Sequence, residues 1–182
     1  MSHHLGSNLS ATFYSSNEFS SSPFLLFSKI LSVALTSFCL LLSASTVKHS
    51  KLARMEYPYF YLMALLAVLL LISSNNLIYC YLNLELLNFC LYLLIGAQVS
   101  SSLANEASQR YFLYSSYASA LFLLGIALLY GIFGSLNLSV LEQLLSASLA
   151  LPAPPHYMLL HLSLIFIYGG LLFKLAIFPF HF

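Results

Sequence analysis

Long apolar runs dominate the chain, and short polar clusters separate them. A run of about 20 apolar residues can cross a bilayer as an α-helix, because backbone groups in hydrocarbon must be satisfied internally. About five stretches meet this criterion, and they lie at about 24–46, 57–73, 76–97 and 111–133, and from about 157 onward. The pattern predicts an all-α fold, a polytopic transmembrane helix bundle of about five spans.

The polar clusters divide this chain into three parts. Residues 1–22 form a Ser-rich polar segment that ends at Pro23. Residues 23–56 contain one predicted span and a basic loop, and residues 57–182 contain the other predicted spans. The first part lacks Lys and Arg, so it resembles neither a secretory signal nor a basic transit peptide. We therefore expect insertion by machinery of the compartment in which the chain is made.

Composition supports a membrane protein and excludes several other classes. Hydrophobic residues make up 60% of the chain and charged residues 6%, against about a quarter charged in ordinary soluble domains. With 6 basic and 5 acidic residues, the chain lacks the basic footprint of a nucleic-acid-binding protein. Cys39, Cys80 and Cys90 lie in apolar runs at no metal-ligand spacing, and we expect them to be small buried residues.

Basic residues are distributed unequally among the predicted loops. Lys48, Lys51 and Arg54 follow the first span, and Arg110 precedes the fourth, whereas the connections after the second and fourth spans have neither Lys nor Arg. Basic loops remain on the cytoplasmic or matrix side of a membrane. This bias predicts that the loop at 47–56 and the segment before residue 111 face that side.

Two charged residues, Glu85 and Lys174, lie within apolar spans far from a span end. A charge at the bilayer centre costs about 2.5–3.5 kcal/mol on insertion scales, so such residues face the protein interior or a hydrated cavity. One interpretation is a structural ion pair that holds two helices together. The other is proton handling, since desolvation favours the neutral forms while mutual attraction favours the charged ones. A pair balanced between these tendencies is a candidate proton relay.

Pro179 follows Lys174 within the same apolar run. Proline lacks an amide proton and cannot continue the backbone hydrogen-bond ladder, so it predicts a break or bend one turn after Lys174. Broken helices at membrane depth line protein or watered cavities, although simple helix termination is the alternative reading. Gly169 and Gly170 precede the lysine and favour close approach of another backbone.

Several motifs occur in the order found in one known family. The strings SSNNL and NLELL lie in the second and third predicted spans, NEASQRYF and LLYGIFGS bracket the fourth, and GGLLFKLAIFPFHF ends the chain. Over about 57–182 the chain resembles the antiporter-like membrane subunits of respiratory complex I. Arg110 stands where that family has Lys, which keeps the charge.

This resemblance implies a partial antiporter-like membrane domain with a discontinuous helix near the C-terminus. It implies that Glu85 and Lys174 correspond to the paired glutamate and lysine with which the family translocates protons, driven by quinone reduction elsewhere in the complex. Members bind neither NADH, flavin nor iron–sulfur clusters, so no cofactor is expected in this chain. The alternatives are a cation/proton antiporter subunit and a purely structural scaffold of the membrane arm.

Further expectations follow from the details of the resemblance. The sequence Pro179-Phe180-His181 favours the branch called chain 2 over its sister chains 4 and 5. Because the family's pattern continues beyond the residue that matches Phe182, we expect an N-terminal fragment of a split subunit, with the C-terminal half on a separate chain. The expected partners are that chain, other membrane-arm subunits of complex I and lipid, in the inner mitochondrial membrane.

Overall fold

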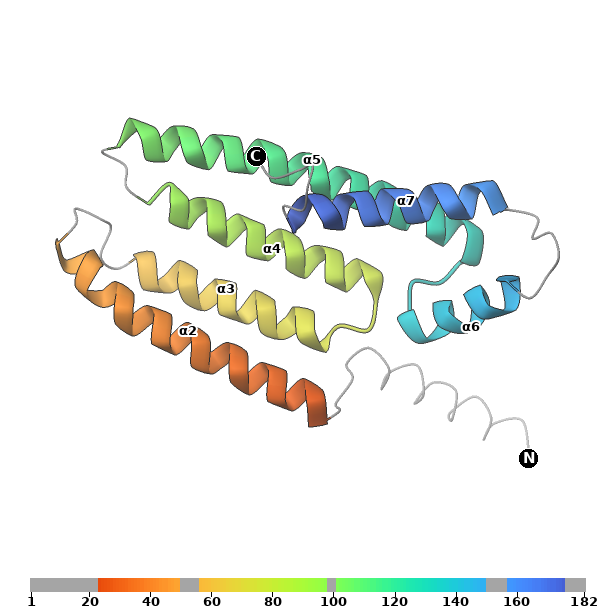
Figure 1. Cartoon of the computed structure of the whole chain (residues 1–182), viewed down its shortest axis with the longest axis horizontal. Helices are drawn as coiled ribbons and strands as arrows, with labels where there is room; N and C mark the ends of the chain where they lie inside the picture. Colours follow the sequence, from red (N-terminus) through yellow and green to blue (C-terminus); the bar gives the residue numbers. More distant parts are fainter. Residues whose placement is uncertain (1–22, 50–55, 98–100, 150–156, 176–182) are drawn as a thin grey trace, which may run out of the picture.

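The computed structural model describes residues 23–49, 56–97, 101–149 and 157–175, and all regular elements in these ranges are helices. Within these ranges six helices follow one another, coloured from red to blue in Figure 1. Their bounds are α2 Pro23–His49, α3 Glu56–Ser73, α4 Leu77–Ile95, α5 Ser102–Phe133, α6 Leu138–Leu149 and α7 Tyr157–Lys174. The predicted all-α fold is therefore confirmed.

Three of these helices are long and apolar enough to cross a membrane, namely α4, α5 and the part of α2 at Pro23–Ser43. The remaining two predicted spans correspond to the shorter apolar helices at Tyr57–Ser73 and Met158–Lys174. Each of the five predicted spans therefore has an apolar helix in the structure. The helices carry many exposed leucines and aromatic residues, as expected for surfaces that face lipid or further protein.

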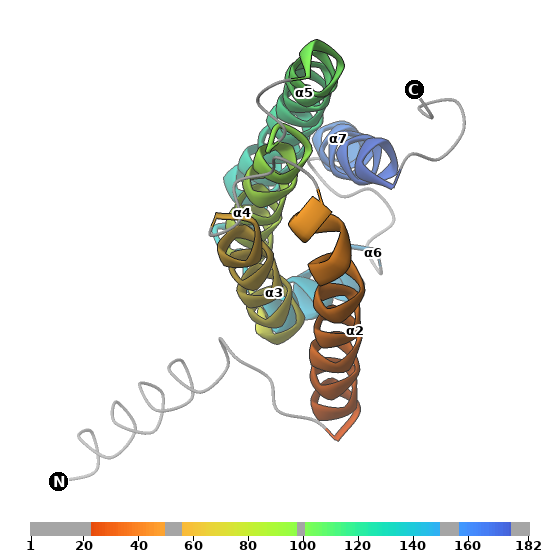
Figure 2. The ribbon, with the colours of Figure 1, turned by 90° about the vertical axis from the view of Figure 1, so that its left-hand side faces the viewer.

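The helices α3, α4 and α5 lie in a row, and α2 and α7 lie on the same side of it (Figure 2). Successive long helices run in opposite directions, so the C-terminal ends of α2 and α4 lie at the same end of the bundle as the N-terminal end of α5 (Figure 1). This alternation agrees with the two basic segments facing one side of the membrane. Lys51 and Arg54 lie outside the described residues.

Helix α5 begins nine residues before its predicted start. Ser101 caps it, since the Ser101 hydroxyl accepts a hydrogen bond from the Ala104 amide at 3.3 Å. Arg110 therefore lies inside the helix, where it pairs with Glu106 one turn earlier. The expectation that Arg110 belongs to a loop segment was wrong, because a capped helix accommodates this polar stretch.

Helix α6 was not predicted from the sequence. It is a 12-residue helix with a polar side that includes the exposed Glu142 and Gln143, while Leu141 is 4% exposed and belongs to the core. Its apolar stretch is too short for a membrane span, so the criterion of about 20 apolar residues does not identify this helix.

A cluster of buried hydrophobic side chains lies between α5, α6 and α7. It consists of Phe122, Ile126, Leu129, Leu141 and Ile167. This cluster fixes α7 against α5, and the packing positions the residues of the candidate site.

Of the three cysteines, Cys90 is buried, Cys80 is half-buried and Cys39 is exposed on α2. The expectation of burial is therefore correct for Cys90 alone.

Candidate functional site

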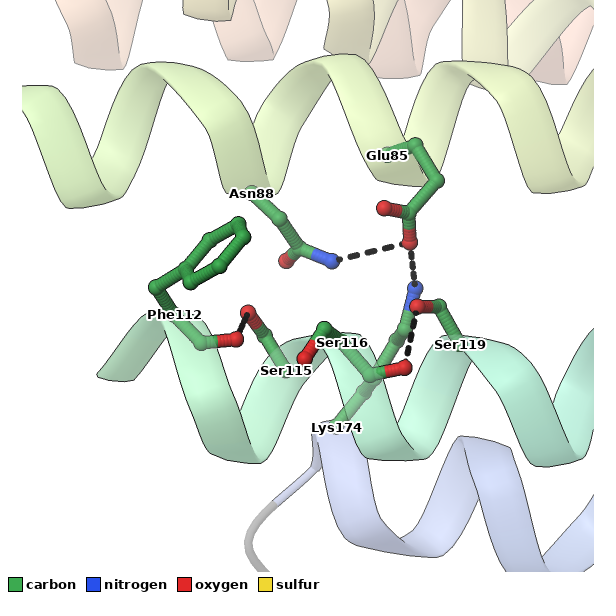
Figure 3. A network of polar contacts seen from close by, with 7 residues as sticks. All are labelled: Glu85, Asn88, Phe112, Ser115, Ser116, Ser119 and Lys174. Carbon is green, nitrogen blue, oxygen red and sulfur yellow. Dashed lines mark hydrogen bonds and ion pairs between the residues drawn. The ribbon is translucent and has the colours of Figure 1, made fainter. Parts of the chain in front are cut away.

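Glu85 and Lys174 form an ion pair in the structure. The Lys174 Nζ lies 3.2 Å from the Glu85 Oε1, and the lysine side chain is 11% exposed, against 35% for the glutamate (Figure 3). The pair joins the middle of α4 to the last residue of α7. The structure thus brings together the two charged residues that the sequence places within apolar spans.

Close helix packing brings the lysine to this position. A Cβ atom on Gly170 would lie 2.8 Å from the Phe122 Cβ, and one on Gly125 would lie 2.6 Å from the Ile167 Cγ1. The two glycines therefore let α5 and α7 approach more closely than larger residues permit. Gly169 has open space where its Cβ would be, so of the glycine pair in the sequence only Gly170 makes the close contact.

The offset of α7 explains how a residue near its end meets the middle of α4. Lys174 lies about 25 Å from the start of α7 at 1.5 Å per residue. If α7 began level with the start of α4, Lys174 would lie beyond the middle of α4. Figure 1 shows that the Tyr157 end of α7 extends beyond the Leu77 end of α4. The shift along the bundle axis brings Lys174 level with Glu85.

The end of α7 contributes to the electrostatics of the site. Lys174 is its last helical residue, and the Leu175 amide donates to the Leu171 carbonyl at 3.0 Å in a final turn. A cation at a helix C-terminus is stabilised by the partial negative charge of the terminal carbonyl groups. Pro179 and the predicted break lie outside the described residues, so the break stays a prediction.

Asn88 is a third member of the polar cluster, and the sequence analysis missed it. Its Nδ2 donates to the Glu85 Oε1 at 3.5 Å, the same oxygen that accepts from Lys174. Asn88 lies three residues after Glu85, and this spacing places both side chains on one face of α4. A polar residue at that spacing from a charged one in an apolar helix is the signal that identifies it.

A cavity of about 590 Å³ adjoins the ion pair, and it lies between α4, α5 and the end of α7. Its lining includes Lys174 and Asn88 at one place and Ile95, Ala107 and Arg110 near the ends of α4 and α5. It therefore extends from the lysine toward the end of the bundle where Arg110 lies. Tyr111, Tyr114, Ser115, Ala118 and Phe173 complete the lining.

The serines of α5 lie beside the pair, as Figure 3 shows, but they are committed to local contacts. The Ser115 and Ser119 hydroxyls donate to the carbonyls of Phe112 and Ser116, at 3.1 and 2.9 Å. Serines in membrane helices commonly bond backwards in this way. Ser115 also lines the cavity, so its oxygen remains available to accept a hydrogen bond.

Metal binding has no support in the described part of the chain. No group of three or more His, Cys, Asp or Glu side chains there has the geometry to hold a metal ion. His156 and His181 lie outside the described residues, and His161 is on α7.

Fold and site together define a polytopic membrane protein with an ion pair between its apolar helices. Over residues 74–182 the sequence matches the family model described as NADH:quinone oxidoreductase/Mrp antiporter, transmembrane. The chain belongs to this family of membrane subunits.

Two curated relatives carry the name NADH-quinone oxidoreductase subunit N. That of Paramagnetospirillum magneticum is 35% identical over 85% of this chain, and that of Pelagibacter ubique is 36% identical over the same share. The alignments cover 32% and 31% of those proteins. This chain therefore spans about a third of the length of the curated relatives that it matches.

Two solved structures show the same arrangement of helices. A chain of respiratory complex I from Thermus thermophilus aligns with a TM-score of 0.56 at 35% identity, over 78% of this chain and 30% of that one. A chain of the membrane-bound sulfane sulfur reductase, an archaeal respiratory membrane complex, aligns with a TM-score of 0.69 at 27% identity. That alignment covers 83% of this chain and 29% of that chain.

Proposed function

We propose that this chain is part of a proton-translocating membrane-arm subunit of NADH:quinone oxidoreductase. The observation that carries the proposal is the ion pair between Lys174 and Glu85 beside a cavity of about 590 Å³. An ion pair that served only to hold helices together would be expected to be closely packed. Here the Glu85 side chain is 35% exposed and the cavity has room for water next to the lysine.

In the proposed mechanism Lys174 releases and regains a proton, and Glu85 controls how readily it does so. The carboxylate stabilises the ammonium form at 3.2 Å, as does the C-terminal end of α7. A third charge near the pair weakens or strengthens this stabilisation, and the Lys174 ammonium then gives a proton to water in the cavity or takes one back. The chain itself carries no redox step in this proposal, and it needs no cofactor.

The relatives favour complex I as the assembly, because their names are those of its subunit N and one structural neighbour is complex I. We propose chain 2, the counterpart of that subunit, as the identity, with other membrane-arm subunits as partners. Its proposed location is the inner mitochondrial membrane. Sedimentation of the protein with mitochondrial inner membranes would support this location, and its absence from that fraction would contradict it.

A cation/proton antiporter subunit is the second candidate, since the matched family model includes Mrp antiporters. Purification separates the two candidates. Co-purification with subunits that oxidise NADH supports the first, while isolation without them and a dependence of proton transport on Na⁺ or K⁺ support the second. The scaffold alternative predicts no proton transport through Lys174, which the next experiment tests.

The test replaces Lys174 with Ala in the complete complex and measures protons pumped per NADH oxidised. The variant Lys29→Ala removes a lysine from α2 and serves as the matched control. We expect the complex with Lys174→Ala to assemble and to pump fewer protons per electron, while Lys29→Ala pumps normally. An unchanged ratio in an assembled Lys174→Ala complex would overturn the relay role and leave the scaffold.

A further inference from the structure

Asn76 and Asn137, from two separate connections, lie face to face at one end of the bundle. They form an isolated antiparallel bridge, in which the Leu77 amide donates to the Leu136 carbonyl and the Leu138 amide donates to the Asn75 carbonyl, both at 3.0 Å. The Asn76 Nδ2 also donates to the Asn137 Oδ1 at 3.0 Å. These three hydrogen bonds join the start of α4 to the start of α6, and we call them the asparagine clasp.

Both the oxygen and the nitrogen of the Asn76 side-chain amide form hydrogen bonds. Its Oδ1 accepts from the Ile78 amide at 3.0 Å and caps α4, while its Nδ2 bonds Asn137. Among the residues that cap helix N-termini well, Asn alone has an acceptor and NH₂ donors on the same group, since Ser has one rotatable hydroxyl and Asp no proton to donate when ionised. The cap of α4 is therefore bonded directly to the residue that precedes α6.

The clasp lies at a fixed distance from the ion pair along a rigid helix. Glu85 follows Asn76 by nine residues, which corresponds to about 13 Å along α4 at 1.5 Å per residue. On the other side of the clasp, Leu136 follows α5 through Gly134, a left-handed C-cap with φ 68°. Because α5 also holds α7 through Gly125 and Gly170, the clasp connects the helix of the glutamate to the helix pair that carries the lysine.

Other contacts between α4 and α5 are less able to set this position. The Tyr81 and Phe122 rings lie 6.3 Å apart, and the Tyr92 and Phe112 rings 5.3 Å. Burial of apolar rings is non-directional, and the preferred arrangement of an aromatic pair adds only a modest energy to it. Hydrogen bonds lose strength steeply when their length or angle changes. The axial position of α4 therefore depends on the clasp more than on the rings.

We propose that Asn76 and Asn137 are positioning residues for the Lys174–Glu85 pair. The clasp holds α4 at the axial position in which the glutamate carboxylate meets the lysine ammonium. Without the side-chain bond, only the two backbone hydrogen bonds of the clasp hold this position, so α4 can shift against α5 and α7, and the ion pair lengthens. This inference rests on the proposed function, since its consequence is a change in proton translocation.

The experiment compares two changes at Asn137 in the complete complex. Asn137→Leu removes the acceptor and keeps the number and branching of the side-chain heavy atoms, whereas Asn137→Asp keeps an acceptor for the Asn76 Nδ2. The readouts are the amount of assembled complex, the protons pumped per NADH oxidised and the pH profile of pumping. Lys174→Ala runs in parallel, and the difference between it and the unmodified complex defines the lysine-dependent pumping.

We expect Asn137→Leu to assemble and to lower lysine-dependent pumping about two- to tenfold, the factor that one net hydrogen bond is worth. Its pH profile should shift, because the charge partner of Lys174 has moved, and Asn137→Asp should restore both rate and profile. A purely structural clasp would instead reduce the amount of complex and leave the pH profile of each assembled complex unchanged. That outcome, or equal pumping by the Leu and Asp variants, overturns the positioning role.

A second variant covers the case in which Asn137→Leu does not assemble. Asn76→Ser keeps a side-chain oxygen to cap α4 but lacks the amide donor to Asn137, so the same shift of the pH profile is expected. An unshifted profile with Asn76→Ser overturns the inference. If Lys174→Ala removes pumping while the asparagine variants do not, only the positioning role fails. If Lys174→Ala itself pumps fully, the proposed function fails, and the positioning role with it.

Discussion

The Lys174 Nζ lies 3.2 Å from the Glu85 Oε1, although 89 residues separate the two in the sequence. The contact joins the middle of one apolar helix to the end of another, and the protein between them provides both the packing and the space beside the pair. Removing one partner leaves the other group without its counter-charge, and this favours the neutral form of the group that remains. The following predictions use this coupling and the geometry around the pair.

Glu85→Gln keeps the size of the side chain and removes its charge. The Lys174 ammonium then loses its partner, so its neutral form becomes more favourable and proton uptake weaker. We expect reduced pumping per NADH oxidised with normal assembly, measured by the quenching of a pH-sensitive dye in vesicles. The double variant Glu85→Gln/Lys174→Met completes a mutant cycle. Strictly additive effects on pumping would show that the two residues act independently, contrary to the relay.

Asn88→Leu removes the second donor to the Glu85 carboxylate. Because this hydrogen bond is long, at 3.5 Å, we expect a weaker effect than that of Glu85→Gln, about two- to fivefold on the lysine-dependent pumping. Asn83→Leu makes the same change two residues before Glu85, on a different side of α4, and serves as the control. Equal effects of the two substitutions would remove Asn88 from the site.

The two charged residues could be identified from the sequence, but the offset of α7 and the short helix α6 could not. Charges in apolar runs stand out in any hydropathy reading, so Glu85 and Lys174 are visible without a structure. Neither the offset of α7 nor the helix α6 can be read in this way. The first depends on close contacts of Gly125 and Gly170 with residues on another helix, and the second is a short helix held by its partners rather than by length.

The hydrogen bonds formed by polar residues in the connections between helices could not be predicted from the sequence either. Asn76 and Asn137 each occur in a short polar stretch that is typical of a turn, and only the fold shows that the two turns bond to each other. The same applies to Ser101, whose role as a cap depends on the helix that follows it. A single sequence contains no direct signal for pairing between residues that are 61 positions apart.

Gly170→Ala should weaken the packing of α7 on α5. The new methyl group would lie 2.8 Å from the Phe122 Cβ and 2.9 Å from the Ala118 carbonyl oxygen, so the helices must separate, at a cost of about 1–3 kcal/mol. We expect less assembled complex and a lower melting temperature. Gly169→Ala is the matched control, since its methyl group meets open space in the described structure. Similar losses with both variants would contradict this account of helix packing.

Glu106→Gln and Arg110→Gln test the ion pair on the exposed first turns of α5. Both side chains are largely exposed, at 54% and 69%, and exposed pairs contribute about 0.2–1 kcal/mol. We expect either substitution to leave assembly almost unchanged. Arg110 also lines the cavity, so only its replacement is expected to alter the pH profile of pumping. A pH profile that shifts equally with both variants would indicate that the pair acts as a unit.

Ala107→Phe tests whether the cavity is the route by which protons reach Lys174. Ala107 lines the cavity at the Arg110 end of α5, so a phenyl ring there narrows the passage without touching the ion pair. We expect slower pumping with normal assembly, because a chain of water needs continuous space and polar partners. Ala120→Phe adds the same ring at an exposed position of α5 outside the cavity lining. If both variants assemble and pump at the unmodified rate, protons reach the lysine by another path; if only Ala107→Phe slows pumping, the cavity is the route.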